Sequence, residues 1–536
     1  MRRKSKTFLK ILRFSSIFLL LILTFAYIWG VKSFGDLRMD EIIFTLGTSL
    51  EGTSSGMVVS YLVFGLLPAL LVFTAILLLS SKLGEGLREH LLDRIKIKPL
   101  SRFITSRHNR RLGMSCLILL WAVILFCSAN ANLGIVDYVK SILIRSEFIE
   151  EHYVAYEPST SAAETGGKNR ARVEFPAKKR NLIHILVESG ESSLMDKENG
   201  GLFNENYIPE LTDIARENVF FSQDDKFSGA ITTPGSTWTV AGMVSEYGGI
   251  PLKIAIESNS MDKCDLFLPG AYFLGDILQD AGYKNYFMCG SVIDFGGRRK
   301  LLEQHGDYEI FDYVWAKETG RIPKDYFVWW GYEDQKLFDF AKEMLTKINP
   351  TDQPFNFSIL TVDTHHIGGY KCEKCQNEFA DQYANVYACS SRQIKDFVDW
   401  IKKQDFYENT SIVITGDHDS MDPNFFSPTN PTVPQENTKE SDIAGFRKVY
   451  NAFINPAEQP LKMKNRRFTT LDFYPTILAS LGVDIEGDRL GLGTNLFSDR
   501  DTLAEEYGYA YLAKEINRRS SFYDHILLYG EEKQDD

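Results

Sequence analysis

Near the N-terminus, the hydrophobic positions form long uninterrupted runs rather than a periodic pattern. Three of these runs contain no charged residue, and they cover Phe14–Val31, Met57–Ser81 and Leu112–Val136. A helix needs about 20 apolar residues to cross a hydrocarbon core about 30 Å thick, so each run is long enough. The first run has an alternative as a cleaved signal peptide, but no small-residue cleavage site is evident and two further runs follow. The pattern predicts a membrane domain of three transmembrane helices over residues 1–136.

Beyond residue 180 the pattern changes to short apolar runs that alternate with amphipathic ones. The strand-like runs cover 181–187, 283–288, 356–362 and 411–415, and the helix-like runs cover 207–217, 271–281, 333–347 and 388–403. This alternation predicts an α/β/α sandwich in which a mostly parallel sheet lies between helices. We expect residues 181–536 to form that domain. Residues 137–180 are predicted to be a juxtamembrane segment and a linker, because the linker part is rich in Ser, Gly, Ala and Lys.

The distribution of charge predicts an orientation in the membrane. Residues 1–13 carry six Lys/Arg and no acid, segment 82–111 carries nine Lys/Arg and three acids, and segment 32–56 carries two basic and four acidic residues. By the positive-inside rule, the first two segments are cytoplasmic and everything after Val136 lies outside. Subtracting the net charges of +6, −2 and +6 of these segments from the total of −12 leaves −22 for residues 133–536. An acidic domain of this kind argues against nucleic acid as a partner.

Two of the strand-like runs end on side chains that can bind a metal. Asp417 and His418 follow the run 411–415 after a single glycine, and Glu188 follows the run 181–187 directly. The carboxyl ends of parallel strands meet at one edge of a sheet, where α/β enzymes have their sites. An oxygen-rich set with one imidazole suits Mn²⁺ or Zn²⁺ better than a metal that selects thiolates. Taken singly, Glu188 has an alternative as a surface carboxylate, and His418 as a hydrogen-bonded loop histidine.

Between these two strands, a Pro-Gly turn leads into a predicted helix. Pro234 and Gly235 form the bend, and the apolar spacing that follows places Ser236 and Thr237 in the first helical turn. A hydroxyl there can act simply as an N-cap. It can also act as a nucleophile, because a helix N-terminus offers N–H groups to a phosphate and a nearby divalent cation lowers the pKa of the hydroxyl. The turn alone favours the cap, and the neighbouring ligand set favours the nucleophile.

A third strand-like run and a glycine loop carry candidates for contact with a phosphate. The run 356–362 leads to His365 and His366, of which we expect only one to hydrogen-bond a phosphoryl oxygen or protonate a leaving alkoxide, because adjacent side chains point in different directions. Arg298 follows a strand-like run and two glycines, a loop that lets a guanidinium approach a phosphate with bidentate geometry. A solvated surface arginine is the alternative.

Five of the seven cysteines fall in the predicted external domain, where disulfides persist: Cys264, Cys289, Cys372, Cys375 and Cys389. The spacing of Cys372 and Cys375 also occurs in zinc sites, but no second close pair completes one. Disulfides or free thiols are therefore favoured over zinc, and the connectivity cannot be deduced from the sequence.

Several strings in this domain resemble one known family in content and in order. They are Trp238–Val244, Gly249–Leu252, Leu274–Leu278, Leu360–His366, Cys389–Ser390, Gly416–His418, Asp472–Ile477 and Gly491–Gly493. With them, residues 181–497 resemble the phosphoglycerol transferase I family. That family belongs to the branch of the alkaline phosphatase and sulfatase superfamily that holds lipoteichoic acid synthase and the phosphoethanolamine transferases.

The resemblance implies one divalent metal ion, with Mn²⁺ expected before Zn²⁺ or Mg²⁺, held by Glu188, Asp417 and His418. It also implies that His365 contacts the substrate phosphate and that Arg298 does so less securely. His366 is retained as a second substrate-binding candidate beside His365.

The resemblance implies that the nucleophile, which also contacts the metal, is Ser236. Relatives usually carry threonine there, so Thr237 and Thr233 remain open; counting back five positions from Ala241 selects Ser236. The sulfatase signature of Cys or Ser followed two residues on by Pro and then Arg is missing around Ser236, which argues against a formylglycine sulfatase.

The implied activity is a two-step transfer of phosphoglycerol from phosphatidylglycerol, through a covalent phospho-enzyme, to a periplasmic glucan. The implied location is the bacterial inner membrane, with the catalytic domain on the periplasmic face. One alternative is a phosphoethanolamine or phosphoglycerol transferase that acts on lipopolysaccharide, a capsule or a teichoic-type polymer. An alternative of another class is a non-catalytic membrane scaffold that kept the fold.

Overall fold

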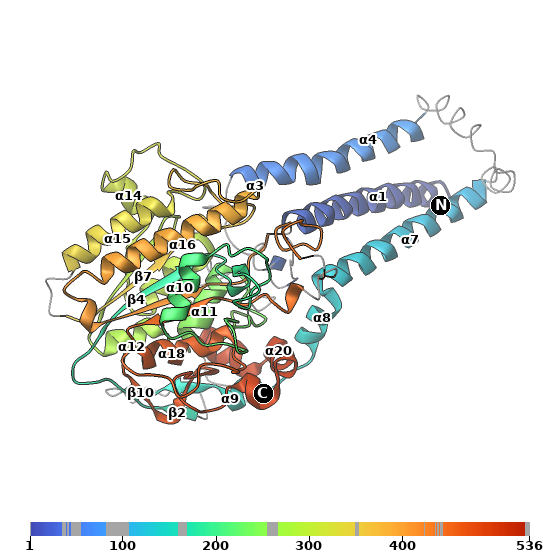
Figure 1. Ribbon diagram of the computed structural model, residues 1–536. Helices are drawn as coiled ribbons and strands as arrows, with labels where there is room; N and C mark the ends of the chain where they lie inside the picture. The colour runs from blue at the N-terminus through green and yellow to red at the C-terminus, as the bar shows by residue number, and fades with distance from the viewer. Residues whose placement is uncertain are drawn as a thin grey trace. The chain divides into compact units, whose positions relative to one another are not determined.

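The computed structural model of the chain contains two compact units (Figure 1). One unit comprises residues 1–39 and 53–137, and the other comprises residues 40–52 and 138–536. The structure describes residues 2–34, 39, 42–43, 55–81, 107–158, 169–253, 266–348, 353–422, 424–434, 436, 439 and 443–530.

The first unit consists of long apolar helices. They are α1 (Arg2–Ser33), a second helix made of α3 (Ser55–Ser60), the π-helical η1 (Tyr61–Leu66) and α4 (Leu67–Ser80), and α7 (Arg107–Leu133). Three stretches in them are long and apolar enough to cross a membrane: Phe8–Ser33, Gly56–Ser80 and Leu112–Leu133. The third span was predicted to reach Val136, but it ends at Leu133 because Gly134 adopts a left-handed backbone with φ of +62°.

Within this unit, tryptophan side chains link the helices. The indole N–H of Trp29 donates to Ser60 Oγ over 3.0 Å, and that of Trp121 donates to Thr24 Oγ1 over 3.2 Å. Such hydrogen bonds stabilise helix pairs where lipid offers no competing partner. Residues 82–106 and most of segment 32–56 lie outside the described residues, so the predicted orientation stays a prediction.

The second unit is built on a six-stranded sheet. The strand order is β6 (Glu309–Phe311), β5 (Lys284–Cys289), β7 (Phe355–Leu360), β4 (Asn181–Val187), β8 (Thr410–Gly416) and β9 (Asn451–Ile454). All neighbours pair parallel except β8 and β9, which pair antiparallel. The predicted mostly parallel sheet is confirmed, and β6 and β9 extend its two edges.

Helices cover both faces of this sheet, because both faces of its strands are apolar. In β4, Leu182 and Leu186 pack into one core, and Ile183, Ile185 and Val187 pack into the other. The first core contains residues of α11 (Thr239–Gly248), α12 (Leu274–Asp280) and α18 (Phe473–Ser480), and the second contains residues of α10 (Pro209–Glu217), α15 (Asp334–Ile348) and α16 (Gln382–Ile401) (Figure 1). The unit is an α/β/α sandwich, as predicted.

Part of the predicted linker is instead part of this second unit. Strand β1 (Val154–Tyr156) pairs with β2 (Asn169–Ala171), and β3 (Val173–Glu174) pairs with β10 (Asp484–Ile485). The prediction of a linker is therefore wrong for residues 169–171 and 173–174, which pair with other strands of this unit. Further elements of the chain are α8 (Ile135–Leu143), α9 (Phe148–His152), α13 (Arg298–Gln304), α14 (Tyr313–Glu318), β11 (Arg489–Leu490), β12 (Gly493–Thr494), α19 (Leu503–Tyr507) and α20 (Tyr509–Asn517).

Candidate metal and phosphate site

The register of the central strands brings the predicted ligands together. In the parallel pair of β4 and β8, Val187 lies opposite Gly416, so Glu188 and Asp417 leave the sheet at the same point. One ligand atom from each of Glu188, Asp417 and His418 lies within 4.8 Å of the other two, and all three residues are buried. The surface alternative for Glu188 is therefore wrong.

The imidazole of His418 has the orientation of a metal ligand. Its Nδ1 lies 2.7 Å from the carbonyl oxygen of Asp419, and because a carbonyl can only accept, this nitrogen carries a proton. Nε2 then faces the carboxylates, 3.4 Å from Glu188 Oε1 and 3.5 Å from Asp417 Oδ2. A backbone carbonyl that holds one ring nitrogen is the usual way in which proteins present the other to a metal.

The carboxylate of Asp417 leaves one oxygen without a donor. Its Oδ1 accepts hydrogen bonds from the backbone N–H groups of Ser189 and His418, both over 2.8 Å. Its Oδ2 is buried and has no hydrogen-bond partner within the described part of the chain. A buried carboxylate oxygen left this way costs free energy unless a cation or a proton satisfies it. The three residues therefore fit a divalent cation.

The electrostatics of the cluster lead to the same conclusion. Burial, together with the charge of Glu188, raises the pKa of Asp417 to about 8. Burial opposes the charging of His418, but Asp417 and Glu188 outweigh it and raise its pKa to about 10. Burial also opposes the ionisation of Glu188, yet His365 and His418 hold its pKa below the usual range. Without a cation the cluster retains protons that a divalent ion would replace.

Two glycines allow the backbone around this cluster to pack closely. A Cβ on Gly416 would lie 1.8 Å from the carbonyl oxygen of Gly190, so the two ligand-bearing turns touch directly. A Cβ on Gly242, in α11, would lie 2.1 Å from the carbonyl oxygen of Asp417. Helix α11 therefore packs against the end of β8 with no side chain between them, and its first turn reaches the ligands.

The hydroxyl at that first turn is Thr239, which the sequence analysis missed. Thr239 is the first residue of α11, and its Oγ1 donates to Glu188 Oε2 over 3.3 Å. The same oxygen lies 3.5 Å from His418 Nε2. Thr239 and Gly242 lie one helical turn apart, so the close approach at Gly242 fixes Thr239 beside the ligands.

Ser236 has a different role in the structure. Ser236 was predicted to lie in the first turn of a helix, but α11 begins three residues later, at Thr239, so this prediction is wrong. Ser236 Oγ donates to the carbonyl of Thr233 over 2.9 Å and accepts from the N–H of Thr233 over 2.8 Å. Its hydroxyl closes the turn formed where Gly235 has φ of +81°. Thr237 is half-buried in the same turn. The spacing of Thr233, Ser236, Thr237 and Thr239 in the sequence does not show which hydroxyl lies beside the ligands. Thr239 lies there because the helix starts later than predicted.

The loop after β7 holds Glu188 as well as the predicted histidines. Thr361 Oγ1 accepts from the N–H of Glu188 over 2.9 Å, and Thr364 Oγ1 donates to its carbonyl over 2.5 Å. His365 Nδ1 lies 2.7 Å from the carbonyl oxygen of His366, which again places a proton on Nδ1. Burial lowers the pKa of His365, although the charge of Glu188 opposes this. The rings of His365 and His366 stack with their centroids 4.4 Å apart, so the expectation that the two adjacent side chains point in different directions is wrong, and His366 is the more deeply buried of the two.

Arg298 is a buried residue, so its alternative as a solvated surface arginine is wrong. It is the first residue of α13, and its Nε donates to the carbonyl of Phe295 over 3.1 Å. Its Nη2 donates to Ser291 Oγ over 3.2 Å and to the carbonyl of Val292 over 2.8 Å. The guanidinium is held by its own loop, and its charge contributes to the lowered pKa of His365.

Comparison with known proteins identifies the family. A family model described as Sulfatase matches residues 180–483, which contain every ligand described above. The chain belongs to the sulfatase family.

Curated relatives in this family carry the name that the sequence suggested. Phosphoglycerol transferase I of Xanthomonas axonopodis pv. citri is 32% identical over 313 residues, which are 57% of this chain and 41% of the relative. Phosphoglycerol transferase I of Escherichia coli O127:H6 is 29% identical over 475 residues, which are 87% of this chain and 53% of the relative. The predicted resemblance is confirmed, and the chain spans about half the length of the curated relatives it matches.

Two solved structures are also similar. The lipoteichoic acid synthase LtaP from Listeria monocytogenes is 16% identical, with a TM-score of 0.48 and coverage of 66% of this chain and 82% of that chain. The lipooligosaccharide phosphoethanolamine transferase A (EptA) from Neisseria meningitidis is 14% identical, with a TM-score of 0.47 and coverage of 87% of this chain and 84% of that chain.

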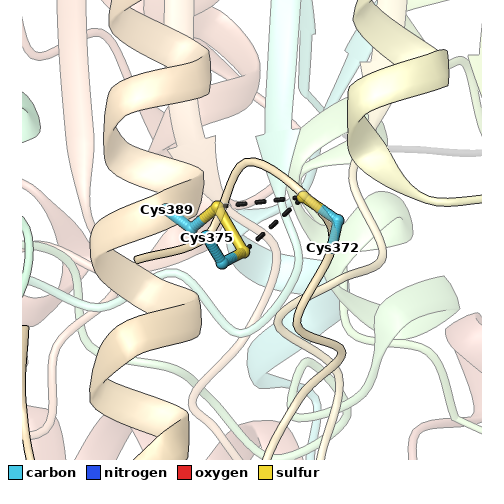
Figure 2. Close-up of side chains that lie close together, drawn as sticks. All are labelled: Cys372, Cys375 and Cys389. Atoms are coloured by element: carbon cyan, nitrogen blue, oxygen red, sulfur yellow. Dashed lines mark hydrogen bonds between the residues drawn. A yellow bond between two sulfur atoms is a disulfide. The ribbon is translucent and has the colours of Figure 1, made fainter. Parts of the chain in front are cut away.

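In this member of the sulfatase family, the cysteines form a second group apart from the carboxylates. Cys375 and Cys389 are joined by a disulfide beside the buried free thiol of Cys372 (Figure 2). Cys289 is a buried free thiol outside this group. Cys264 lies outside the described residues.

Proposed function

We propose that this chain is a metal-dependent transferase that moves phosphoglycerol from phosphatidylglycerol to a periplasmic glucan. The observation that carries the proposal is the position of Thr239, whose hydroxyl lies 3.3 Å from Glu188 Oε2 and 3.5 Å from His418 Nε2. A hydroxyl at a helix start, inside a buried group of metal-ligand side chains, has the arrangement of an activated nucleophile. The relatives named phosphoglycerol transferase I support the choice of the donor.

In this proposal, Glu188, Asp417 and His418 hold one divalent cation, with Mn²⁺ as the first candidate. When bound, such an ion supplies positive charge that lowers the pKa of the Thr239 hydroxyl and offsets the charge of the phosphate. The donor set of two carboxylates and one imidazole suits Mn²⁺, Zn²⁺ and Mg²⁺ to different degrees.

Thr239 takes the role first assigned to Ser236. Its Oγ1 attacks the phosphorus of the lipid head group, a bond forms between that oxygen and phosphorus, and the bond from phosphorus to the diacylglycerol oxygen breaks. The proton of the hydroxyl passes to the departing diacylglycerol oxygen. Glu188 accepts the hydrogen bond of the Thr239 hydroxyl and orients the oxygen for this attack. The product of the first step is a phosphoglycerol ester of Thr239.

His365 acts in the second step as a base. Because its Nδ1 proton is donated to the carbonyl of His366, its free nitrogen is Nε2, which accepts the proton of the attacking sugar hydroxyl. The sugar oxygen then forms the new bond to phosphorus, the bond from phosphorus to Thr239 Oγ1 breaks, and that oxygen takes up the proton held by His365. Arg298 lies close enough to affect His365 electrostatically and is proposed to attract the phosphate oxygens.

We also propose that the catalytic unit faces the periplasm of a bacterial inner membrane. The three apolar helices and the basic residues 1–13 support this orientation. A membrane domain over residues 1–136 would retain a catalytic domain over residues 181–536 in the compartment of its lipid donor.

The test uses the full chain in detergent with head-group-labelled phosphatidylglycerol and Mn²⁺. Label is expected on a peptide that contains Thr239, to vanish in Thr239→Ala and to persist in the matched variant Ser236→Ala. Label on Ser236, Thr237 or Thr233 would overturn the assignment of Thr239. Label from phosphatidylethanolamine alone would change the donor, and no label from any phospholipid with folded protein would favour the scaffold. Mass spectrometry of periplasmic glucans from cells with and without the protein tests the acceptor.

A further inference from the structure

Three sulfur atoms of the second unit lie close together, although a disulfide can use only two of them (Figure 2). Beside the disulfide of Cys375 and Cys389, the Sγ of Cys372 lies 3.5 Å from that of Cys375 and 3.9 Å from that of Cys389. Cys372 and Cys375 belong to the loop that follows His365 and His366, and Cys389 belongs to α16. The loop can therefore be tied to the same helix through either of its two cysteines.

We propose that these cysteines form a thiol–disulfide exchange site in which Cys389 alternates its partner between Cys375 and Cys372. The Cys372 thiolate attacks the Sγ of Cys389, the bond between Cys372 and Cys389 forms, and the bond between Cys375 and Cys389 breaks. Cys375 leaves as a thiolate and takes up the proton that Cys372 gave up. One thiol and one disulfide are present before and after, so no oxidant or reductant is consumed.

The burial of the three sulfurs gives the exchange its direction. Cys372 and Cys389 are buried, and Cys375 is half-buried. Of the two possible leaving groups, Cys375 is the one whose negative charge water can solvate, so attack on Cys389 is favoured over attack on Cys375. The exchange therefore leaves the accessible sulfur as the free thiol.

A buried amide lies beside the two sulfurs that form the new bond. Gln393 Nε2 donates toward Cys389 Sγ over 3.6 Å and toward Cys372 Sγ over 3.8 Å. An N–H donor in this position stabilises the thiolate of Cys372 at the start of its attack on Cys389. Burial, with Asp363 and Asp334 nearby, raises the pKa of Cys372, which keeps it a thiol between exchanges.

The exchange has a structural consequence for the loop. When Cys389 pairs with Cys372, the covalent tie lies nearer in sequence to His366 than when it pairs with Cys375. The loop that carries both histidines is then held more closely to α16. The freed Cys375 thiol becomes available to an external thiol or disulfide.

The first test replaces each cysteine in the full chain, purified without reductant and mapped by non-reducing peptide mass spectrometry. Cys375→Ser is expected to contain a disulfide between Cys372 and Cys389, and the matched variant Cys372→Ser is expected to keep the disulfide of Cys375 and Cys389. If Cys375→Ser contains two free thiols at these positions while Cys372→Ser is oxidised, the proposal is overturned.

The second test needs only wild-type protein and Cys372→Ser. Incubation of the wild type with an alkylating reagent is expected to label Cys375 and to accumulate peptides linked through Cys372 and Cys389. Cys375 should be labelled at least about tenfold faster in the wild type than in Cys372→Ser. Labelling of Cys372 alone, with Cys375 and Cys389 still joined, contradicts exchange. A sulfur-to-metal charge-transfer band on addition of Co²⁺ to the wild type, lost in Cys372→Ser, would assign the three sulfurs to a metal instead.

Discussion

Two groups of three potential metal ligands lie in the same unit, and they differ in what satisfies their ligand atoms. In the first group, Asp417 Oδ1 accepts from the N–H of Ser189, Glu188 Oε1 accepts from the hydroxyl of Ser189, and His418 Nδ1 donates to a backbone carbonyl. Asp417 Oδ2 is left without a donor among the described residues. In the group of Cys372, Cys375 and Cys389, two of the sulfurs are already bonded to each other. Closeness of ligands is common to both groups, and only the first has a buried lone pair that an ion would satisfy.

The contrast shows that the surroundings of a side chain, as well as its identity, decide whether a cluster suits a metal ion or a disulfide. Hydrogen bonds around the carboxylates hold three separate side chains in place. Among the cysteines, the covalent bond itself holds the residues, and the neighbouring thiol can exchange with it. The two groups should therefore respond to substitution in different measurements.

The largest expected effect comes from Asp417→Asn. The amide keeps the shape of the side chain but removes the charge that a cation requires, so label transfer should fall by about 10³-fold or more. Isothermal titration with Mn²⁺ should show that binding is lost, whereas Asp419→Asn, whose side chain contacts Thr232, should retain it. Full activity in Asp417→Asn would remove the basis for treating the first group as a metal site.

The double variant Cys375→Ser/Cys389→Ser should act on stability instead. The disulfide closes a loop with a sequence separation of 14, and its loss should lower the free energy of unfolding by about 3 kcal/mol. Thermal unfolding of the variant and wild type measures the change. Mn²⁺ titration of the folded variant should match wild type, and a lost Mn²⁺ site would show that the two groups are not independent.

Gly242→Ala should disturb the contact between α11 and the first group. A Cβ there would lie 2.1 Å from the carbonyl oxygen of Asp417, so the helix or the strand end must shift and Thr239 must move away from Glu188. We expect a loss of about 10- to 100-fold in label transfer, because misplacing a reacting atom is costly. Mn²⁺ binding should persist in the same protein, and an unchanged rate would show that the position of Thr239 is not critical.

The smallest effect is expected from Thr361→Val. The valine has nearly the same shape but cannot accept the hydrogen bond from the N–H of Glu188, which would be left buried and unpaired. The free energy of unfolding should fall by about 1–3 kcal/mol. Denaturant unfolding measures it, with a parallel Mn²⁺ titration that should show weaker binding. A change in stability with unchanged Mn²⁺ affinity would limit Thr361 to a structural role.

The strands that carry the ligands could be predicted because both of their faces are buried. Both faces of the strands Asn181–Val187 and Thr410–Gly416 are buried, so the strands appear in the sequence as short apolar runs. The ends of these runs located Glu188 and Asp417. Strand β9 has only 4 residues, and its antiparallel pairing with β8 depends on partners distant in sequence. Residues 173–174 pair with residues 484–485, which are still more distant in sequence, and composition alone suggested a linker.

The proposed nucleophile, Thr239, could not be predicted from the sequence. The segment from Thr232 to Thr239 is rich in hydroxyls, and the sequence shows where a bend occurs but not how far the turn extends. The extent is set by the hydrogen bonds of Ser236 with Thr233 and by the packing of Gly242 on Asp417. Both depend on three-dimensional contact, whereas the predicted Glu188, Asp417 and His418 depended only on where strands end.

The contact between Gly190 and Gly416 also bears on how this site can change by mutation. Since a Cβ on Gly416 would lie 1.8 Å from the Gly190 carbonyl oxygen, neither ligand-bearing turn can acquire bulk at this point independently of the other. A lineage that altered the site would have to change both turns together or pass through a poorly folded intermediate. In the cysteine group, the contacts that join the three residues are made by side chains instead. Single substitutions should therefore be tolerated more readily around the sulfur atoms than around the carboxylates.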